Sequence, residues 1–109
     1  MKFHVYYVYI LTNAHHTVLY TGVTNNIELR GLQHKDKVNK GFTSKYNVNK
    51  LIYYEVFQFI DMAIQREKQI KGYSRQKKLD LIRKFNPEMF ELIMDGRVVR
   101  PSDLKKQDG

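Results

Sequence analysis

The chain has 109 residues, of which 42% are hydrophobic, so it can fold as one domain and is too short for two independent cores. It contains no cysteine, which excludes disulfide bonds and cysteine-based zinc sites. Its formal net charge of +8 favours polyanionic partners, because bound lysine and arginine release the counterions condensed on phosphates. No apolar run approaches the ~18 residues of a membrane-spanning helix, and the tyrosine-rich N-terminus lacks a signal-peptide cleavage site. We therefore expect a cytoplasmic protein that makes no membrane contact.

The first half of the chain predicts an antiparallel hairpin followed by a helix. Residues 3–11 are β-branched and aromatic on both faces, as in a strand that is covered on both sides. A polar turn separates them from a second strand over residues 18–23. A helix is expected over residues 26–37, with Asn25 or Asn26 as its N-cap. The polar and basic residues that follow, 39–49, indicate a surface loop.

The second half predicts a third strand over residues 51–59 and then helices. Asp61 is the expected N-cap of a helix that ends at Gly72, and Ser74 begins a basic helix that runs to about residue 85. The sequence Asn86-Pro87 predicts a last short helix, since proline fits the first helical position.

The predicted fold class is therefore α/β (α+β), with a small three-stranded antiparallel sheet and flanking helices. Residues 3–85 would form the domain. Residues 86–109 would form a C-terminal short helix and a tail, which we expect to be mobile because little apolar surface remains after Asp95.

Both central helices carry polar side chains where an apolar stripe should face the core. Arg30 and His34 fall inside the inward stripe of the first helix. Glu67 falls in the middle of the apolar arc of the second helix, whereas Arg66 lies on its solvent-facing arc. The apolar arc consists of Ile60, Ala63, Ile64 and Ile70. A carboxylate in such an arc is costly unless a cation or a metal satisfies it. The alternatives are a buried Glu67–Arg30 salt bridge, a helix rotated so that Glu67 lies at its rim, or a functional site, and three polar intrusions together favour the site.

The same residues resemble the motifs of a known family. Tyr7-Val8-Tyr9 followed by Tyr20-Thr21-Gly22 resembles the paired tripeptides of the GIY-YIG nucleases. The stretch from Gly22 to Arg30, a His34 four residues later, and Glu67 within Ala63-Ile64-Gln65-Arg66-Glu67-Lys68-Gln69-Ile70-Lys71 continue the resemblance. It covers roughly residues 3–83, and the chain is similar to small, stand-alone bacterial GIY-YIG proteins in particular. Two positions depart from the pattern. Tyr7 replaces the first glycine, and Leu79 stands near an asparagine that many relatives carry about twelve residues after the glutamate.

The resemblance implies phosphodiester hydrolysis with a single divalent cation, Mg²⁺ or Mn²⁺. Glu67 would hold the ion and Arg30 would bind the scissile phosphate. Tyr9, Tyr20 and His34 would position and deprotonate the attacking water, with either Tyr20 or His34 as the general base. We expect these five residues to meet on one concave surface.

The basic residues predict a surface that contacts nucleic acid, which we expect to be DNA. The candidates for phosphate contact are Lys40, Lys45, Lys71, Arg75, Lys77 and Lys78. Three functions remain open: a DNA-processing endonuclease, a nucleic-acid-binding module of the same fold without turnover, and a basic adaptor that meets a protein. Because the chain has no second domain to provide specificity, a protein partner could supply it. The sequence does not determine the oligomeric state.

Overall fold

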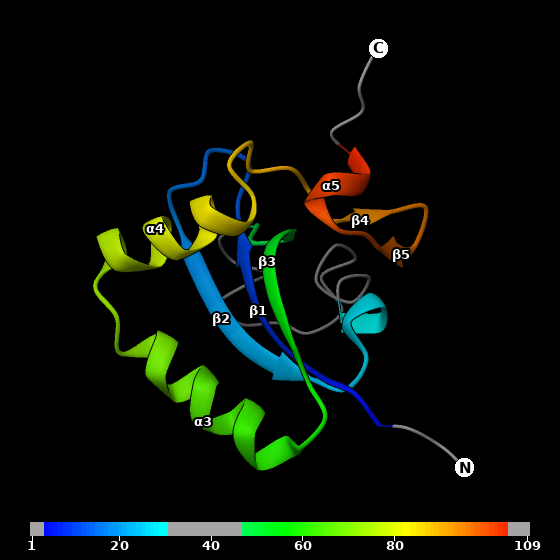
Figure 1. Ribbon diagram of the computed structural model, residues 1–109. Helices are drawn as coiled ribbons and strands as arrows, with labels where there is room; N and C mark the ends of the chain where they lie inside the picture. Colours follow the sequence, from blue (N-terminus) through cyan, green and yellow to red (C-terminus); the bar gives the residue numbers. More distant parts are fainter. Residues whose placement is uncertain (1–3, 31–46, 105–109) are drawn as a thin grey trace.

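The computed structural model describes residues 4–30 and 47–104. Three strands, β1 (Tyr6–Thr12), β2 (Leu19–Thr24) and β3 (Lys50–Phe57), form an antiparallel sheet with the order β2-β1-β3 (Figure 1). The predicted hairpin pairs Tyr9 with Gly22, and β1 also pairs with β3 along its other edge. The predicted fold class is confirmed, and the strands begin and end within three residues of the predicted bounds. β2 is an edge strand.

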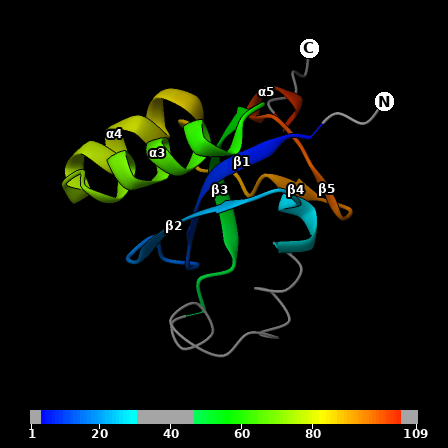
Figure 2. The same cartoon turned by 90° about the horizontal axis from the view of Figure 1, so that it is seen from below.

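The sheet is covered on both faces. The helices α3 (Ile60–Lys71) and α4 (Arg75–Phe85) lie on one face (Figure 2). A helical turn at residues 27–30 and the two-stranded β4 (Ile93–Met94) and β5 (Arg97–Val98) lie on the other. This turn is the described part of the helix predicted over residues 26–37. The rest of that helix and most of the predicted loop lie outside the described residues.

Alternation along β1 divides the core into two clusters, one on each face of the sheet. Val8 and Ile10 are fully buried in one cluster with Ala63 of α3, whereas Tyr9 and Leu11 are buried in the other with Ile27. Successive side chains of a strand point to opposite faces, so a central strand covered on both sides must be apolar at every position. This is the pattern that predicted the strand.

The helix ends follow the predicted capping residues in part. The Asn26 side chain accepts a hydrogen bond from the Leu29 amide at 3.0 Å, and the Ser74 side chain accepts one from the Lys77 amide at 3.1 Å, so both caps are confirmed. The prediction for Asp61 was wrong. The N-cap of α3 is Phe59, which makes no side-chain cap, and Asp61 lies within the first turn, where its charge is favourable at a helix N-terminus.

Asn86 does not begin a helix, in contrast to the prediction. It follows α4 as its C-cap and is fully buried. Its Nδ2 donates to the carbonyl oxygens of Ile52 and Phe90 at 2.9 Å each, and its Oδ1 accepts from the Phe90 amide at 3.0 Å. The side chain thus satisfies three backbone groups, which holds the turn after α4 against β3.

The segment after Asn86 packs on the sheet up to residue 104, whereas the mobility of the tail after Asp95 stays a prediction. The Leu92 amide donates to the Leu51 carbonyl at 2.8 Å, and the Tyr54 hydroxyl donates to the Val99 carbonyl at 2.9 Å. The short helix of this segment is α5 (Pro101–Leu104). Leu92 is fully buried, and its apolar contact offsets the entropy of ordering the segment. Residues 105–109 lie outside the described part.

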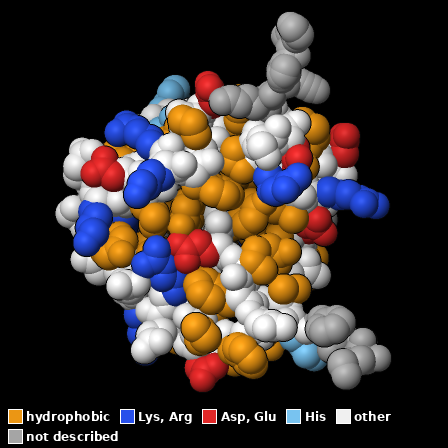
Figure 3. All heavy atoms as spheres, viewed as in Figure 1, with side chains coloured by type: hydrophobic (Ala, Val, Ile, Leu, Met, Phe, Trp, Pro, Cys, Tyr) orange, Lys and Arg blue, Asp and Glu red, His pale blue; other side chains and the backbone are white. Residues whose placement is uncertain are grey.

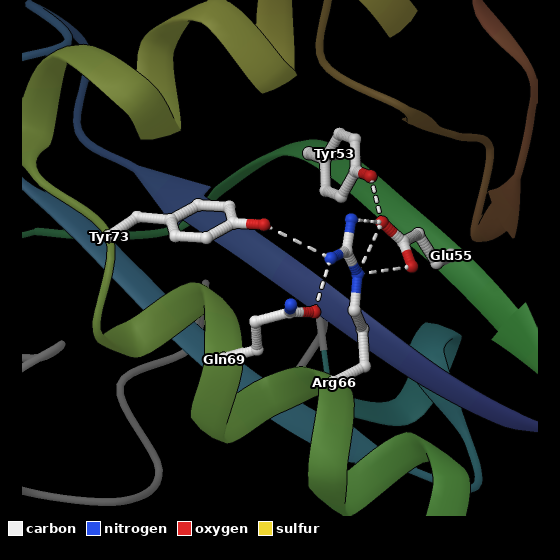
Figure 4. A network of polar contacts seen from close by, with 5 residues as sticks. All are labelled: Tyr53, Glu55, Arg66, Gln69 and Tyr73. Atoms are coloured by element: carbon white, nitrogen blue, oxygen red, sulfur yellow. Dashed lines mark hydrogen bonds and ion pairs between the residues drawn. The ribbon is translucent and has the colours of Figure 1, made fainter.

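A polar network attaches α3 to β3 (Figure 4). Arg66, which was predicted to face solvent, donates two hydrogen bonds of 2.9 Å to the Glu55 carboxylate, from Nε to Oε1 and from Nη2 to Oε2. Its Nη1 donates to Gln69 Oε1 at 2.6 Å and to the Tyr73 hydroxyl at 3.2 Å. The Tyr53 hydroxyl also donates to Glu55. The prediction failed because helical periodicity assigns a polar residue outward, whereas this guanidinium reaches back to the sheet edge.

Replacing Arg66 with alanine should lower the free energy of unfolding by about 1–3 kcal/mol, because the Glu55 carboxylate would lose its charged partner. The larger loss of stability expected for a fully buried ion pair does not apply, since both side chains are about one quarter exposed and water screens their interaction. Chemical denaturation would measure the change. The matched control is Arg83→Ala on the exposed side of α4, which should change stability little. Equal effects of the two variants would contradict a structural role for the network.

Candidate active site

Two tyrosines from adjacent strands meet on the sheet face opposite α3. Tyr9 on β1 is 3% exposed, and its ring centroid lies 6.5 Å from that of Tyr20 on β2. Both side chains pack with the buried cluster that contains Ile27. Tyr20 pairs with Leu11, which lies two residues after Tyr9 on β1, so all three side chains point to the same face of the sheet. The two motif tyrosines, Tyr9 and Tyr20, therefore lie side by side on this face of the sheet.

Gly22 makes room for the Tyr9 phenol. A Cβ added at Gly22 would lie 2.5 Å from the Tyr9 hydroxyl oxygen and 2.6 Å from Cζ, which is closer than real side-chain carbons approach. Glycine in a strand interior often marks such a close approach. Since Gly22 is on the edge strand, the missing side chain lets the hydroxyl of Tyr9 lie over β2.

Charged groups from two further elements act on this hydroxyl. Burial raises the pKa of Tyr9 well above its usual range, Tyr20 and Glu67 raise it further, and Arg30 lowers it. The Tyr9 phenol is therefore protonated at neutral pH, the form in which it can donate a hydrogen bond. Four of the five predicted residues thus lie close enough together to interact electrostatically. His34, the fifth, lies outside the described residues.

The elements that carry Arg30 and Glu67 lie on opposite faces of the sheet (Figure 2). Side chains from these two elements can meet on one concave surface, as expected, only if they come together at an edge of the sheet. The two helices cover the two faces of a central strand, and they approach the edge strand β2 from its two sides. The single concave surface over all five residues stays a prediction.

Glu67 lies on the inner side of α3, between the fully buried Ala63 and Ile70. Its side chain is only 13% exposed, and its Oε2 accepts from Lys71 Nζ at 2.7 Å. Within residues 4–30 and 47–104, no ion pair joins Glu67 to Arg30, so that alternative is wrong. The predicted apolar arc was too wide. Ile60 and Ile64 are 48% and 37% exposed, and the inner stripe consists of the buried Ala63 and Ile70 with the partly buried Glu67 between them.

The donor set suits a hard cation that retains water. Among the described residues, no group of three or more His, Cys, Asp or Glu side chains gathers at one place. Glu67 supplies one carboxylate, and Mg²⁺ keeps several water ligands and needs only one or two carboxylates. The Lys71 ammonium already shows that the Glu67 carboxylate can hold a positive charge.

The predicted phosphate-contacting residues of α3 and α4 have individual partners. Lys71 pairs with Glu67, Arg75 Nη2 donates to the His16 carbonyl at 2.9 Å, and Lys77 Nζ lies 4.3 Å from the Tyr73 ring centroid. Lys78 is partly exposed on α4. Lys and Arg side chains gather over α4 on this face of the molecule (Figure 3). Lys40 and Lys45 lie outside the described residues.

The sequence interpretation missed two features near the site. His16, regarded as part of the turn, has its Nε2 at 3.0 Å from Lys50 Nζ, and its pKa is lowered by burial, then by Lys50 and His15. Thr21, the middle residue of the second tripeptide, is buried on the face of β2 toward α3. Strand alternation from Tyr20 places Thr21 on that face, so its orientation could have been predicted from the sequence.

Comparison with known proteins finds similarity over the part of the chain that contains these site residues. The profile of the GIY-YIG catalytic domain matches residues 5–80. A UPF0213 protein of Syntrophus aciditrophicus is 42% identical over 83 residues, covering 75% of this chain and 93% of the relative. One of Staphylococcus saprophyticus is 38% identical over 77 residues, covering 71% and 93%. The solution NMR structure of a UPF0213 protein from Bacillus halodurans is 28% identical, with a TM-score of 0.46 and coverage of 72% of this chain and 82% of that one.

Proposed function

Because the chain belongs to the GIY-YIG family of nuclease-type domains, we propose that it is a metal-dependent endonuclease that cleaves phosphodiester bonds in DNA. The family predicted from the sequence is confirmed. One observation supports the proposal above the others. The phenol of Tyr9 lies over Gly22 at the edge of the sheet, where Tyr20, Arg30 and Glu67 all act on it. These groups come from four separate segments of the chain.

Each group has a proposed role that its chemistry supports. The planar guanidinium of Arg30 would hold two oxygens of the scissile phosphate. Glu67 would hold a single Mg²⁺ or Mn²⁺, which when bound neutralises phosphoryl charge and lowers the pKa of a bound water. Tyr9, which stays protonated, would donate a hydrogen bond to the attacking water or to a phosphate oxygen. Tyr20 or His34 would take the proton from that water.

The direct test is a cleavage assay on branched, nicked and single-stranded DNA with Mg²⁺, Mn²⁺ or EDTA. We expect cleavage that needs the divalent ion and yields fragments with discrete ends. Binding of all three DNAs without cleavage under any of these conditions would contradict the proposal. It would instead favour a module that binds nucleic acid without turnover.

Nucleic-acid binding without turnover has one specific observation in its favour. Leu79, near the position of the family asparagine, packs on the core with the buried residues of α3. Asn86 cannot substitute for that asparagine, because its amide is already bonded to three backbone groups around β3. A basic adaptor that meets a protein is the third possibility, and a protein partner could also supply the specificity of an active enzyme. The described residues form no helix long and apolar enough to cross a membrane.

DNA binding should fall steeply as salt rises, by about 10³-fold or more between about 50 and 200 mM, because the basic surface of α4 would act mainly through phosphates. Lys77→Gln should weaken binding to all sequences alike and reduce the slope of log affinity against log salt by about one. The matched control is Arg97→Gln on β5, away from α4 and exposed. Fluorescence anisotropy at several salt concentrations measures both slopes. Binding that does not respond to salt would favour the adaptor.

A further inference from the structure

Thr21 carries a buried hydroxyl that has no hydrogen-bond partner. The residue is 5% exposed, and within residues 4–30 and 47–104 its Oγ1 neither donates nor accepts a hydrogen bond. Thr12 makes a clear contrast, since it is fully buried and its Oγ1 donates to the Val18 carbonyl at 2.8 Å. A buried polar atom without a partner costs free energy, and valine of the same shape would avoid that cost. The presence of a hydroxyl group at this buried position therefore needs a physical explanation.

The position of Thr21 in the sheet directs its side chain toward α3. Thr21 pairs with Ile10 across the hairpin, and directly paired residues point to the same face. Ile10 belongs to the core cluster that includes the buried residues of α3. Leu19 and Val23, two residues before and after Thr21, pack on the same cluster. Thr21 thus lies between two apolar contacts of β2 with α3.

Glu67 holds the matching position on the helix. It lies four residues after Ala63 and three before Ile70, so all three side chains share the face of α3 that packs on β1 and β2. A second observation agrees with this placement. Glu67 acts electrostatically on the Tyr9 phenol, and that phenol lies over Gly22, the residue next to Thr21. Helix packing and electrostatics therefore both place the carboxylate beside this part of β2.

We propose that Thr21 is a positioning residue for Glu67. The Thr21 hydroxyl donates a hydrogen bond to the Glu67 carboxylate when a divalent cation replaces Lys71 as the charge partner of that carboxylate. This inference rests on the proposed function. In the structure, the carboxylate is held by Lys71, whose side chain is 53% exposed and free to move into solvent. Once a divalent ion binds Glu67, repulsion weakens the contact with Lys71, and the carboxylate needs another donor to fix its orientation. Ligating carboxylates are generally held by such outer hydrogen bonds.

The experiment compares Thr21→Val and Thr21→Ser with the wild type by thermal melting across a Mg²⁺ titration. Thr21→Val keeps the side-chain shape and removes the unpartnered hydroxyl, so without Mg²⁺ it should melt at the same temperature or higher. Its Mg²⁺ concentration for the half-maximal shift in melting temperature should rise by about 10-fold or more. Thr21→Ser should restore the wild-type dependence. The control Thr12→Val should lower the melting temperature, because Val18 loses its donor, and leave the Mg²⁺ dependence unchanged.

The outcomes separate the two proposals. If the wild type responds to Mg²⁺ and Thr21→Val responds at the same concentration, the inference about Thr21 is wrong and the metal site stands. If Thr21→Val melts well below the wild type without Mg²⁺ and shows an unchanged Mg²⁺ dependence, the hydroxyl has a structural role only. If neither the melting nor the cleavage activity of the wild type responds to Mg²⁺ or Mn²⁺, the metal site and the role of Thr21 both fail.

Discussion

Glu67→Ala should reduce divalent-ion-dependent cleavage by about 10³-fold or more while leaving the fold nearly unchanged. The loss of the ion would remove several kcal/mol of transition-state stabilisation, and each ~1.4 kcal/mol corresponds to a tenfold change in rate. The stability cost should be small, about 0.5 kcal/mol or less, because the Glu67–Lys71 pair is an i,i+4 pair whose lysine is half exposed. A methyl group also packs well between Ala63 and Ile70.

Cleavage kinetics, thermal melting and DNA binding should be measured on the same variant. Glu88→Ala, an exposed carboxylate in the turn after α4, is the matched control and should retain cleavage. DNA binding by Glu67→Ala should be equal to or slightly tighter than that of the wild type, since a negative charge is removed. A large fall in melting temperature together with no metal effect on the wild type would show that Glu67 is structural, and the nuclease assignment would be withdrawn in favour of a binding module.

Gly22→Ala should reduce cleavage by about 10²-fold through the displacement of one hydroxyl. The new methyl group would lie where the phenol of Tyr9 now lies, so the ring must move by a large fraction of an ångström or more. Displacements of about 1 Å cost about 10²-fold in rate at positioned catalytic groups. Overpacking of the buried ring should also lower the free energy of unfolding by about 1–3 kcal/mol.

A double-variant comparison tests the cause of that loss. Tyr9→Phe alone should reduce cleavage, because the donor is removed. If displacement of the hydroxyl is the mechanism, adding Gly22→Ala to Tyr9→Phe should cost much less activity than it costs the wild type. Full additivity of the two losses in cleavage rate would contradict this mechanism. The control is Gly72→Ala at the end of α3, where φ is −81° and an added Cβ would meet only ordinary contacts of 3.5 Å and 3.7 Å, so the metal-dependent rate should be unchanged.

The sheet could be predicted from the sequence because its signals are local. β1 is apolar on both faces, and a strand with this pattern must lie in the middle of a covered sheet. The intrusion of Glu67 into an apolar stripe also makes it a candidate site residue from the sequence alone, since helical periodicity fixes which side chains share a face. The helix start at Ser74, and Asn25 or Asn26 as a cap, could be predicted for the same reason, because the capping hydrogen bond lies within one turn.

The missed features depend on contacts between distant segments. Arg66 bonds to Glu55 across 11 residues, and Asn86 bonds to the Ile52 carbonyl across 34. Neither partner can be read from the local pattern, and so Arg66 was assigned to solvent and Asn86 to a helix start. That the elements carrying Arg30 and Glu67 cover opposite faces of the sheet was missed for a related reason. Periodicity shows which side of a helix is buried, but it does not show which face of the sheet that side covers.

The hydrogen bond from the Val98 amide to Glu28 Oε2, 2.8 Å long, connects the C-terminal hairpin to the helical turn that carries Arg30. Val98 lies outside residues 5–80, the segment that corresponds to the family domain. The turn of Arg30 is therefore braced from outside the part of this chain that matches the family domain. The segment that contacts the turn of Arg30 thus extends beyond residues 5–80, and the β4–β5 hairpin is structurally part of it.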